Sequence, residues 1–145
     1  MSRPTIVLAE DHPNVAEQLR RVLAGAFDVV AVVGHGEALV KAALRFKPDI
    51  VVTDISMPGM DGLKAAQEIL VHLPSVGIVF VTVHDDRALA RKALLVGLGY
   101  VLKTSAGEEL VDAVNAALDA RPFVSASLGS FETLTGRPAR PHVPH

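Results

Sequence analysis

Residues 50–62 read IVVTDISMPGMDG, and this stretch decides the fold. Four β-branched residues form a run of strand length that ends directly before Asp54. The Met57-Pro58-Gly59 sequence that follows is typical of a turn. After it, apolar residues recur at helical spacing, at Leu63, Ala66, Ile69 and Leu70. The stretch therefore predicts a buried strand, an acidic residue at its end, a loop and a helix.

The same unit recurs along the whole chain. Five apolar runs of strand length lie at residues 5–9, 27–33, 50–53, 77–81 and 99–102. The segments between and after them show helical spacing, as residues 89–95 do after the fourth run. Pro13 can start the first helix, Asp85 or Asp86 can cap the fourth, and Ser105 can cap the fifth. Strict alternation of strands and helices predicts an α/β fold, with a parallel sheet covered by helices on both faces.

Composition narrows the class of protein. The chain has 145 residues, half of them hydrophobic, which is enough for the core of one domain. Cysteine is absent, so neither a disulfide framework nor a thiolate metal site can form. The formal charge of −2 gives no overall attraction to nucleic acid or anionic lipid. The apolar runs are too short to cross a bilayer and the N-terminus lacks a signal-peptide pattern, so we expect a cytoplasmic protein without a membrane partner.

The character of the chain changes near residue 121. Arg121-Pro122 breaks the last helical pattern, and proline, arginine and histidine crowd the final residues. We therefore expect one domain over residues 3–120. Residues 121–145 are interpreted as a flexible C-terminal tail or a severed linker.

Polar side chains follow four of the five runs. Glu10 and Asp11 follow the first run, Asp54 the third, Thr82 the fourth and Lys103 the fifth. Because parallel strands end at the same edge of a sheet, and ligands bind at that edge, we expect these side chains to meet there. Carboxylates this close repel one another unless a cation compensates them. Oxygen ligands alone favour a hard cation such as Mg²⁺, and a carboxylate can act as a nucleophile that gives an acyl phosphate.

Four segments carry a resemblance to a known family. Residues 8–13 (LAEDHP), 53–62 (TDISMPGMDG), 81–86 (VTVHDD) and 99–104 (GYVLKT) resemble, in order and spacing, the receiver domains of bacterial two-component response regulators. The resemblance covers roughly residues 3–118. It implies a three-layer (βα)5 flavodoxin-like, doubly wound fold whose five-stranded parallel sheet has the order 2-1-3-4-5. It also implies a signalling protein, with no enzymatic turnover beyond its own phosphotransfer and slow dephosphorylation.

The resemblance assigns the metal and the phosphoryl group to particular residues. Asp54 is the phosphoacceptor, and a histidine kinase or a phosphotransfer protein is the donor. Mg²⁺, with Mn²⁺ as the alternative, is bound by Asp11, by Asp54 and by the backbone carbonyl of Ser56, while Glu10 binds it through water.

Three further residues have roles that follow from the resemblance. Lys103 and Thr82 contact the phosphate, and Thr82 and Tyr100 form the switch pair. Our hypothesis is that Thr82 moves toward the phosphoryl group and that Tyr100 turns inward on phosphorylation. A homodimer on activation is the family expectation.

Two departures point to a branch of the family. Val83 is bulkier than the residue that many receivers have there, and Thr104 stands where many have proline after a cis peptide bond. Both are typical of receivers that precede a helix-turn-helix DNA-binding domain of the NarL/LuxR type. No such domain follows here, so we expect control of transcription through a missing domain. The alternative is a stand-alone receiver that acts by protein–protein contact or as a phosphorelay intermediate.

Single residues also have simpler explanations. Asp54 alone could cap the following turn, and Asp61 is better explained as the cap of the third helix than as a metal ligand. An aspartyl phosphatase would need an acid two residues after its nucleophile, where this chain has Ser56. A receiver fold kept only for interaction would not need the full set of acidic and basic residues. DNA binding by this chain itself is disfavoured by its balanced charge.

Overall fold

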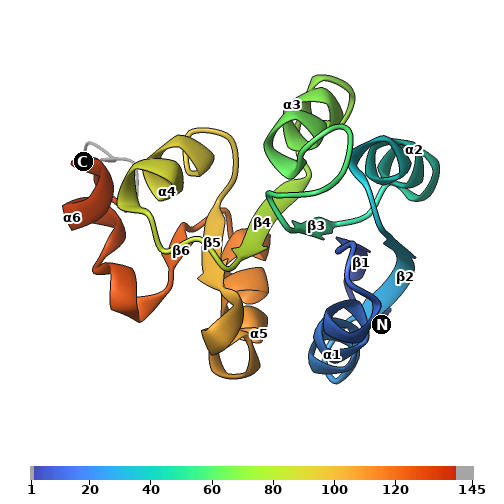
Figure 1. The fold of residues 1–145 in the computed structure, drawn as a ribbon, viewed down its shortest axis with the longest axis horizontal. Coiled ribbons are helices and arrows are strands. Elements are labelled where there is room, and N and C mark those ends of the chain that lie inside the picture. The colour runs from blue at the N-terminus through green and yellow to red at the C-terminus, as the bar shows by residue number, and fades with distance from the viewer. Residues whose placement is uncertain (1, 140–145) are drawn as a thin grey trace.

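The computed structural model describes residues 2–139, which form alternating strands and helices followed by a short C-terminal set of elements (Figure 1). The alternating elements are β1 (Thr5–Ala9), α1 (Pro13–Ala24), β2 (Asp28–Val33), α2 (Gly36–Phe46), β3 (Ile50–Thr53), α3 (Gly62–His72), β4 (Gly77–Thr82), α4 (Arg87–Ala93), β5 (Gly99–Leu102), the 3-10 turn η1 (Lys103–Ser105) and α5 (Ala106–Leu118). The C-terminal elements are β6 (Phe123–Val124), the 3-10 turn η2 (Ala126–Leu128) and α6 (Phe131–Thr135).

The sheet confirms the expected topology and extends it. Its strands have the order β2-β1-β3-β4-β5-β6, and all neighbouring pairs are parallel. The first five strands have the order 2-1-3-4-5 that the resemblance implied, and β6 is added at the β5 edge. In register, Ala9 lies opposite Thr53, so β1 and β3 end level with each other. The residues that follow these two strands are therefore neighbours.

Helices cover both faces of the sheet, as the alternating pattern predicted. Figure 1 shows α1 and α5 on one face and α2, α3 and α4 on the other. Two hydrophobic clusters match these faces: in β4, Ile78 and Phe80 belong to one, while Val79 and Val81 belong to the other. All four side chains are buried. Because both faces are covered, central strands must be apolar at every position, and this explains why the sequence shows runs rather than alternation.

Helix starts agree with most of the capping predictions. The Asp61 carboxylate accepts a hydrogen bond from the Lys64 N–H at 2.8 Å, and the Asp86 carboxylate accepts one from the Ala88 N–H at 2.9 Å. Ser105 does precede α5, but its side chain makes no capping hydrogen bond. The fourth helix begins at Arg87 and ends at Ala93, earlier than the apolar residues alone indicated, because its capping aspartate sets the start.

The segment after Pro122 contains elements that the sequence analysis did not anticipate. We expected a tail from residue 121, whereas β6, η2 and α6 lie between residues 123 and 135 and α6 contacts α4. Leu128 and Leu134 are buried at 4% and 3% exposure. A two-residue strand and a five-residue helix are too short to give a periodic pattern, so only the tertiary contacts reveal them. The tail's last residues, 140–145, lie outside the described residues.

Two further findings concern the peptide bond before Thr104 and the lengths of the helices. The peptide bond between Lys103 and Thr104 is trans. Among the helices described between residues 2 and 139, none combines the length and the apolar composition that a membrane crossing requires.

Candidate functional site

The polar residues that follow β1, β3 and β5 meet at the carboxyl edge of the sheet. Glu10 and Asp54 come directly after the paired strand ends Ala9 and Thr53. Lys103 follows β5 and reaches across to both carboxylates. Glu10 and Asp54 are each 3% exposed. The edge therefore holds two buried acids and one cation that contacts both.

The ammonium group of Lys103 joins the two acids. Its Nζ donates a hydrogen bond to Oδ2 of Asp54 at 2.7 Å and forms an ion pair with Oε1 of Glu10. Burial alone would lower the pKa of Lys103, but the hydrogen bonds and charges of Asp54 and Glu10 outweigh it and raise that pKa. The lysine is therefore a fixed positive charge beside Asp54.

Backbone amides hold the second oxygen of each carboxylate. Oδ1 of Asp54 accepts a hydrogen bond from the Ile55 N–H at 2.7 Å. Oε2 of Glu10 accepts one from the His12 N–H at 3.0 Å. Because each acid is held at one oxygen by the backbone, the orientation of both carboxylates is set by the ends of the strands.

Asp11 supplies a further carboxylate that fits a metal site. Its Oδ1 is buried and accepts no hydrogen bond from any residue between 2 and 139. Glu10, Asp11 and His12 each offer a ligand atom within 4.8 Å of the others. His12 Nδ1 lies 3.2 Å from this oxygen but makes no hydrogen bond to it. A buried carboxylate oxygen without a hydrogen bond is costly, and a divalent cation that prefers oxygen ligands would satisfy it. The residues present therefore fit the expected metal, and Ser56 follows Asp54 in the adjoining loop.

His84 connects the residues expected to act as a switch. Its backbone N–H donates to Oγ1 of Thr82 at 3.2 Å, and its backbone carbonyl accepts from the Tyr100 hydroxyl at 2.7 Å. Its ring Nε2 lies 2.8 Å from Oγ of Ser56. One loop residue thus contacts the end of β4, the side chain from β5 and the loop after Asp54.

Tyr100 lies inward in this structure. Its side chain is fully buried within the cluster that includes Phe80 and Ala90. Burial and the nearby charges of Asp86, Asp85 and Asp54 raise the pKa of Tyr100 to about 12. Tyr100 therefore lies inward, and its movement on phosphorylation stays a prediction.

Two histidines, His12 and His84, also contact residues at this edge. His12 Nδ1 lies 3.0 Å from Oε2 of Glu10 and 3.2 Å from Oδ1 of Asp11. In the sequence, the position of His12 directly after the acidic pair is the feature that could have indicated these contacts. The contact of the His84 ring with Ser56 joins two loops that are far apart in sequence. Val83, the bulkier residue after Thr82, is 67% exposed and lines a hollow with Val15 and Lys103.

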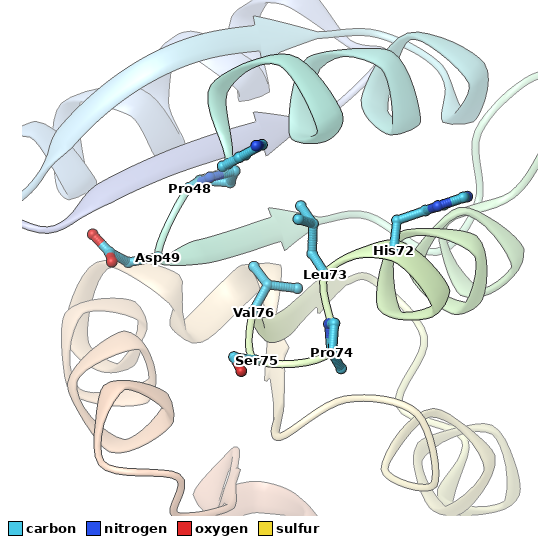
Figure 2. Close-up of a pocket in the computed structure, with 8 residues that line it drawn as sticks. Pro48, Asp49, His72, Leu73, Pro74, Ser75 and Val76 are labelled. Carbon is cyan, nitrogen blue, oxygen red and sulfur yellow. The ribbon is translucent and has the colours of Figure 1, made fainter.

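A separate hollow lies at the opposite edge of the sheet. Figure 2 shows it between the loop before β3 and the loop before β4, with Asp49, His72 and Val76 among its lining residues. Its volume is about 310 Å³. Asp49 precedes β3, whereas Asp54 follows it, so this hollow has no part in the acidic site.

Comparison with known proteins identifies the family. Residues 6–115 match the response regulator receiver domain. The transcriptional regulatory protein YxjL of Bacillus subtilis, itself uncharacterised, is 36% identical over 115 residues, which are 77% of this chain and 53% of that protein. The chain spans between half and two thirds of the length of the curated relatives it matches.

Solved structures agree with this match. A LuxR-family two-component response regulator from Aurantimonas sp. SI85-9A1 has a TM-score of 0.83 and 34% identity, over 88% of this chain and 93% of that one. A structure of two RcsB dimers bound to DNA has a TM-score of 0.81 and 27% identity, over 93% of this chain and 69% of that one. The chain therefore belongs to the response regulator receiver domain family.

Proposed function

We propose that this receiver accepts a phosphoryl group on Asp54 in a Mg²⁺-dependent reaction and passes the signal to an output domain. The donor is a histidine kinase or a phosphotransfer protein. The observation that supports this most is the position of Lys103, whose Nζ contacts both Asp54 and Glu10 at the carboxyl edge of the sheet. A buried carboxylate beside a fixed cation can hold the added negative charge of a phosphoryl group.

The phosphotransfer step follows from these positions. An Asp54 oxygen attacks the phosphorus and forms a new P–O bond, while the bond from phosphorus to the donor's histidine nitrogen breaks and that nitrogen keeps the electron pair. Lys103 then pairs with a phosphoryl oxygen in place of the Asp54 oxygen it holds now. The Thr82 hydroxyl, which accepts from the His84 N–H, donates to another phosphoryl oxygen.

We place the metal ion at the carboxyl edge of the sheet, beside Asp54. We assign its direct ligands to Asp11, Asp54 and the backbone carbonyl of Ser56, and its water-mediated contact to Glu10. Oδ1 of Asp11, which is buried and accepts no hydrogen bond from the described residues, supports this assignment. Mg²⁺, or Mn²⁺ in its place, supplies charge neutralisation for the phosphoryl oxygens when it is bound.

The output of the pathway is proposed from the relatives. YxjL is a transcriptional regulatory protein, and RcsB forms dimers on DNA. We propose that residues 3–120 are the phosphoacceptor unit of a cytoplasmic transcription regulator, that a homodimer forms on activation, and that a DNA-binding domain outside this sequence gives the output. This receiver itself contacts proteins and not nucleic acid.

Intact-mass spectrometry after incubation with acetyl phosphate tests the proposal. A phosphoryl adduct that requires Mg²⁺ and disappears in Asp54→Asn is the expected result. Asp49→Asn is the matched control, because Asp49 lies at the other end of the same strand and should leave the adduct unchanged. An adduct that persists in Asp54→Asn would contradict the assignment of the acceptor.

A further inference from the structure

The C-terminal residues 123–137 cover the edge of the sheet at which Tyr100 lies, and we name them the C-terminal clasp. In β6, Val124 pairs with Tyr100 and Phe123 pairs with Gly99. The Ser125 N–H donates to the Tyr100 carbonyl at 2.9 Å. Figure 1 shows the red end of the chain folded back beside β5 and α4. The clasp therefore forms backbone contacts with the residue expected to switch.

A buried serine fastens the start of the clasp to two other elements. Oγ of Ser125 accepts a hydrogen bond from the Leu102 N–H at 2.8 Å and donates one to Oε1 of Glu109 in α5 at 2.6 Å. The other Glu109 oxygen accepts from the Ala126 N–H at 3.0 Å. Ser125 is fully buried. Because a buried polar group is costly unless it is bonded, these bonds specify a single position for the clasp.

Apolar contacts fasten the remainder of the clasp on α4. Leu128 and Leu134 belong to the same hydrophobic cluster as Tyr100 and as Ala90 and Ala93 of α4. Beyond α6, the Arg137 guanidinium donates to the Leu94 carbonyl at 3.3 Å. The loop before α4 contains His84, whose carbonyl accepts the hydrogen bond of the Tyr100 hydroxyl. The clasp thus contacts both the strand that bears Tyr100 and the helix that follows its hydrogen-bond acceptor.

We propose that docking of the C-terminal clasp stabilises the buried position of Tyr100. Strand β6 pairs with the backbone of Tyr100, and Leu128 and Leu134 lie in the hydrophobic cluster that buries its ring, so release of the clasp removes contacts around this side chain. Docking of the clasp and burial of Tyr100 therefore stabilise each other, and release of one favours release of the other. This burial does not depend on the proposed phosphoacceptor role of Asp54.

The composition of the chain allows a direct test. Tyr100 is the only tyrosine and tryptophan is absent, so tyrosine fluorescence reports on this one side chain. Quenching of that fluorescence by acrylamide should be weak in the unmodified protein. Ser125→Ala and Leu134→Ala should each increase the quenching constant by about twofold or more, because local opening of the clasp exposes the ring.

Two matched variants separate the clasp from general destabilisation. Leu23→Ala removes an equally buried leucine from the other hydrophobic cluster, and Ser75→Ala removes an exposed serine hydroxyl from the α3–β4 loop. Both variants should give the same quenching constant as the unmodified protein. If Leu134→Ala fails to fold, Ser125→Ala and Arg137→Ala still carry the test. Quenching that is unchanged in the folded clasp variants, or raised equally in Leu23→Ala, overturns the proposal.

A second measurement links the clasp to phosphotransfer and rests on the proposed function. If an inward Tyr100 favours the phosphorylated state, Ser125→Ala should form the acetyl phosphate adduct severalfold more slowly than Ser75→Ala. A raised quenching constant together with an unchanged rate of adduct formation supports the proposed effect of the clasp on Tyr100 and overturns its link to phosphotransfer. Absence of an adduct in the unmodified protein overturns the proposed function, while the quenching experiment still decides on the clasp.

Discussion

Asp49 and Asp54 stand at the two ends of the same short strand, and their surroundings give them opposite characters. Asp49 lies before β3 and is exposed, and its Oδ2 accepts hydrogen bonds from the Thr5 N–H at 2.8 Å and from the Thr5 hydroxyl at 3.2 Å. Asp54 lies after β3 and is buried beside Glu10 and Lys103. Asp49 ties β1 to β3 with neutral donors, whereas Asp54 shares a cation with a second acid. Burial and neighbouring charge, and not the residue type, therefore distinguish an aspartate that stabilises the sheet from one that is expected to react.

The sharpest contrast between the two ends is in Mg²⁺ affinity. Asp54→Asn should weaken Mg²⁺ binding by about tenfold or more, because it removes a proposed ligand and one negative charge from the site. Asp49→Asn should leave the affinity unchanged. Calorimetric titration with Mg²⁺ checks both variants. Equal affinities in the two variants would contradict the placement of the metal.

Among the effects on stability, removal of the shared cation should be the largest. Lys103→Met leaves the buried Glu10 and Asp54 carboxylates without their cation, and we expect a loss of about 3–5 kcal/mol in the free energy of unfolding. Urea unfolding at pH 7 with a chelator measures it. Added Mg²⁺ should recover part of the loss by binding only to the folded state. A loss below that of an ordinary surface substitution would show that the two acids do not depend on Lys103.

Raising the pH should weaken the fold through Tyr100. The pKa of Tyr100 rises from 10.0 to about 12 on folding, so the unfolded chain releases this proton first. The neutral ring contributes its full stability below pH 10, and this contribution is lost as pH rises from 10 to about 12. The expected loss is about 2–3 kcal/mol. Urea unfolding across this range checks it, with Tyr100→Phe as a control that should not show this component.

The smallest expected effect on stability comes from a change beside Asp49, at the amino end of β3. Thr5→Ala removes one hydroxyl that Asp49 contacts but keeps the backbone hydrogen bond, so we expect a loss of about 0.5–1 kcal/mol in the free energy of unfolding. Thermal unfolding measures it. A loss as large as that of Lys103→Met would mean that the two ends of the strand are equivalent.

The sequence predicted the fold and the residues that make up the site, because both depend on short, local sequence patterns. Apolar runs at strand length, separated by helical spacing, required a parallel sheet with both faces covered. The ends of parallel strands then brought Glu10, Asp54 and Lys103 together without any knowledge of side-chain contacts. Asp61 and Asp86 cap their helices as predicted, since a cap acts over only a few residues.

Tertiary structure decided the features that have no local pattern. The contact between Ser56 and His84 spans 28 residues of sequence, and the bond between Leu102 and Ser125 spans 23. The inward Tyr100 and the C-terminal clasp depend on such contacts, since a two-residue strand and a short helix are stable only against a preformed surface. By itself, the sequence determined which chemical groups meet at the sheet edge. Long-range packing determined which of them are buried, paired and held in place.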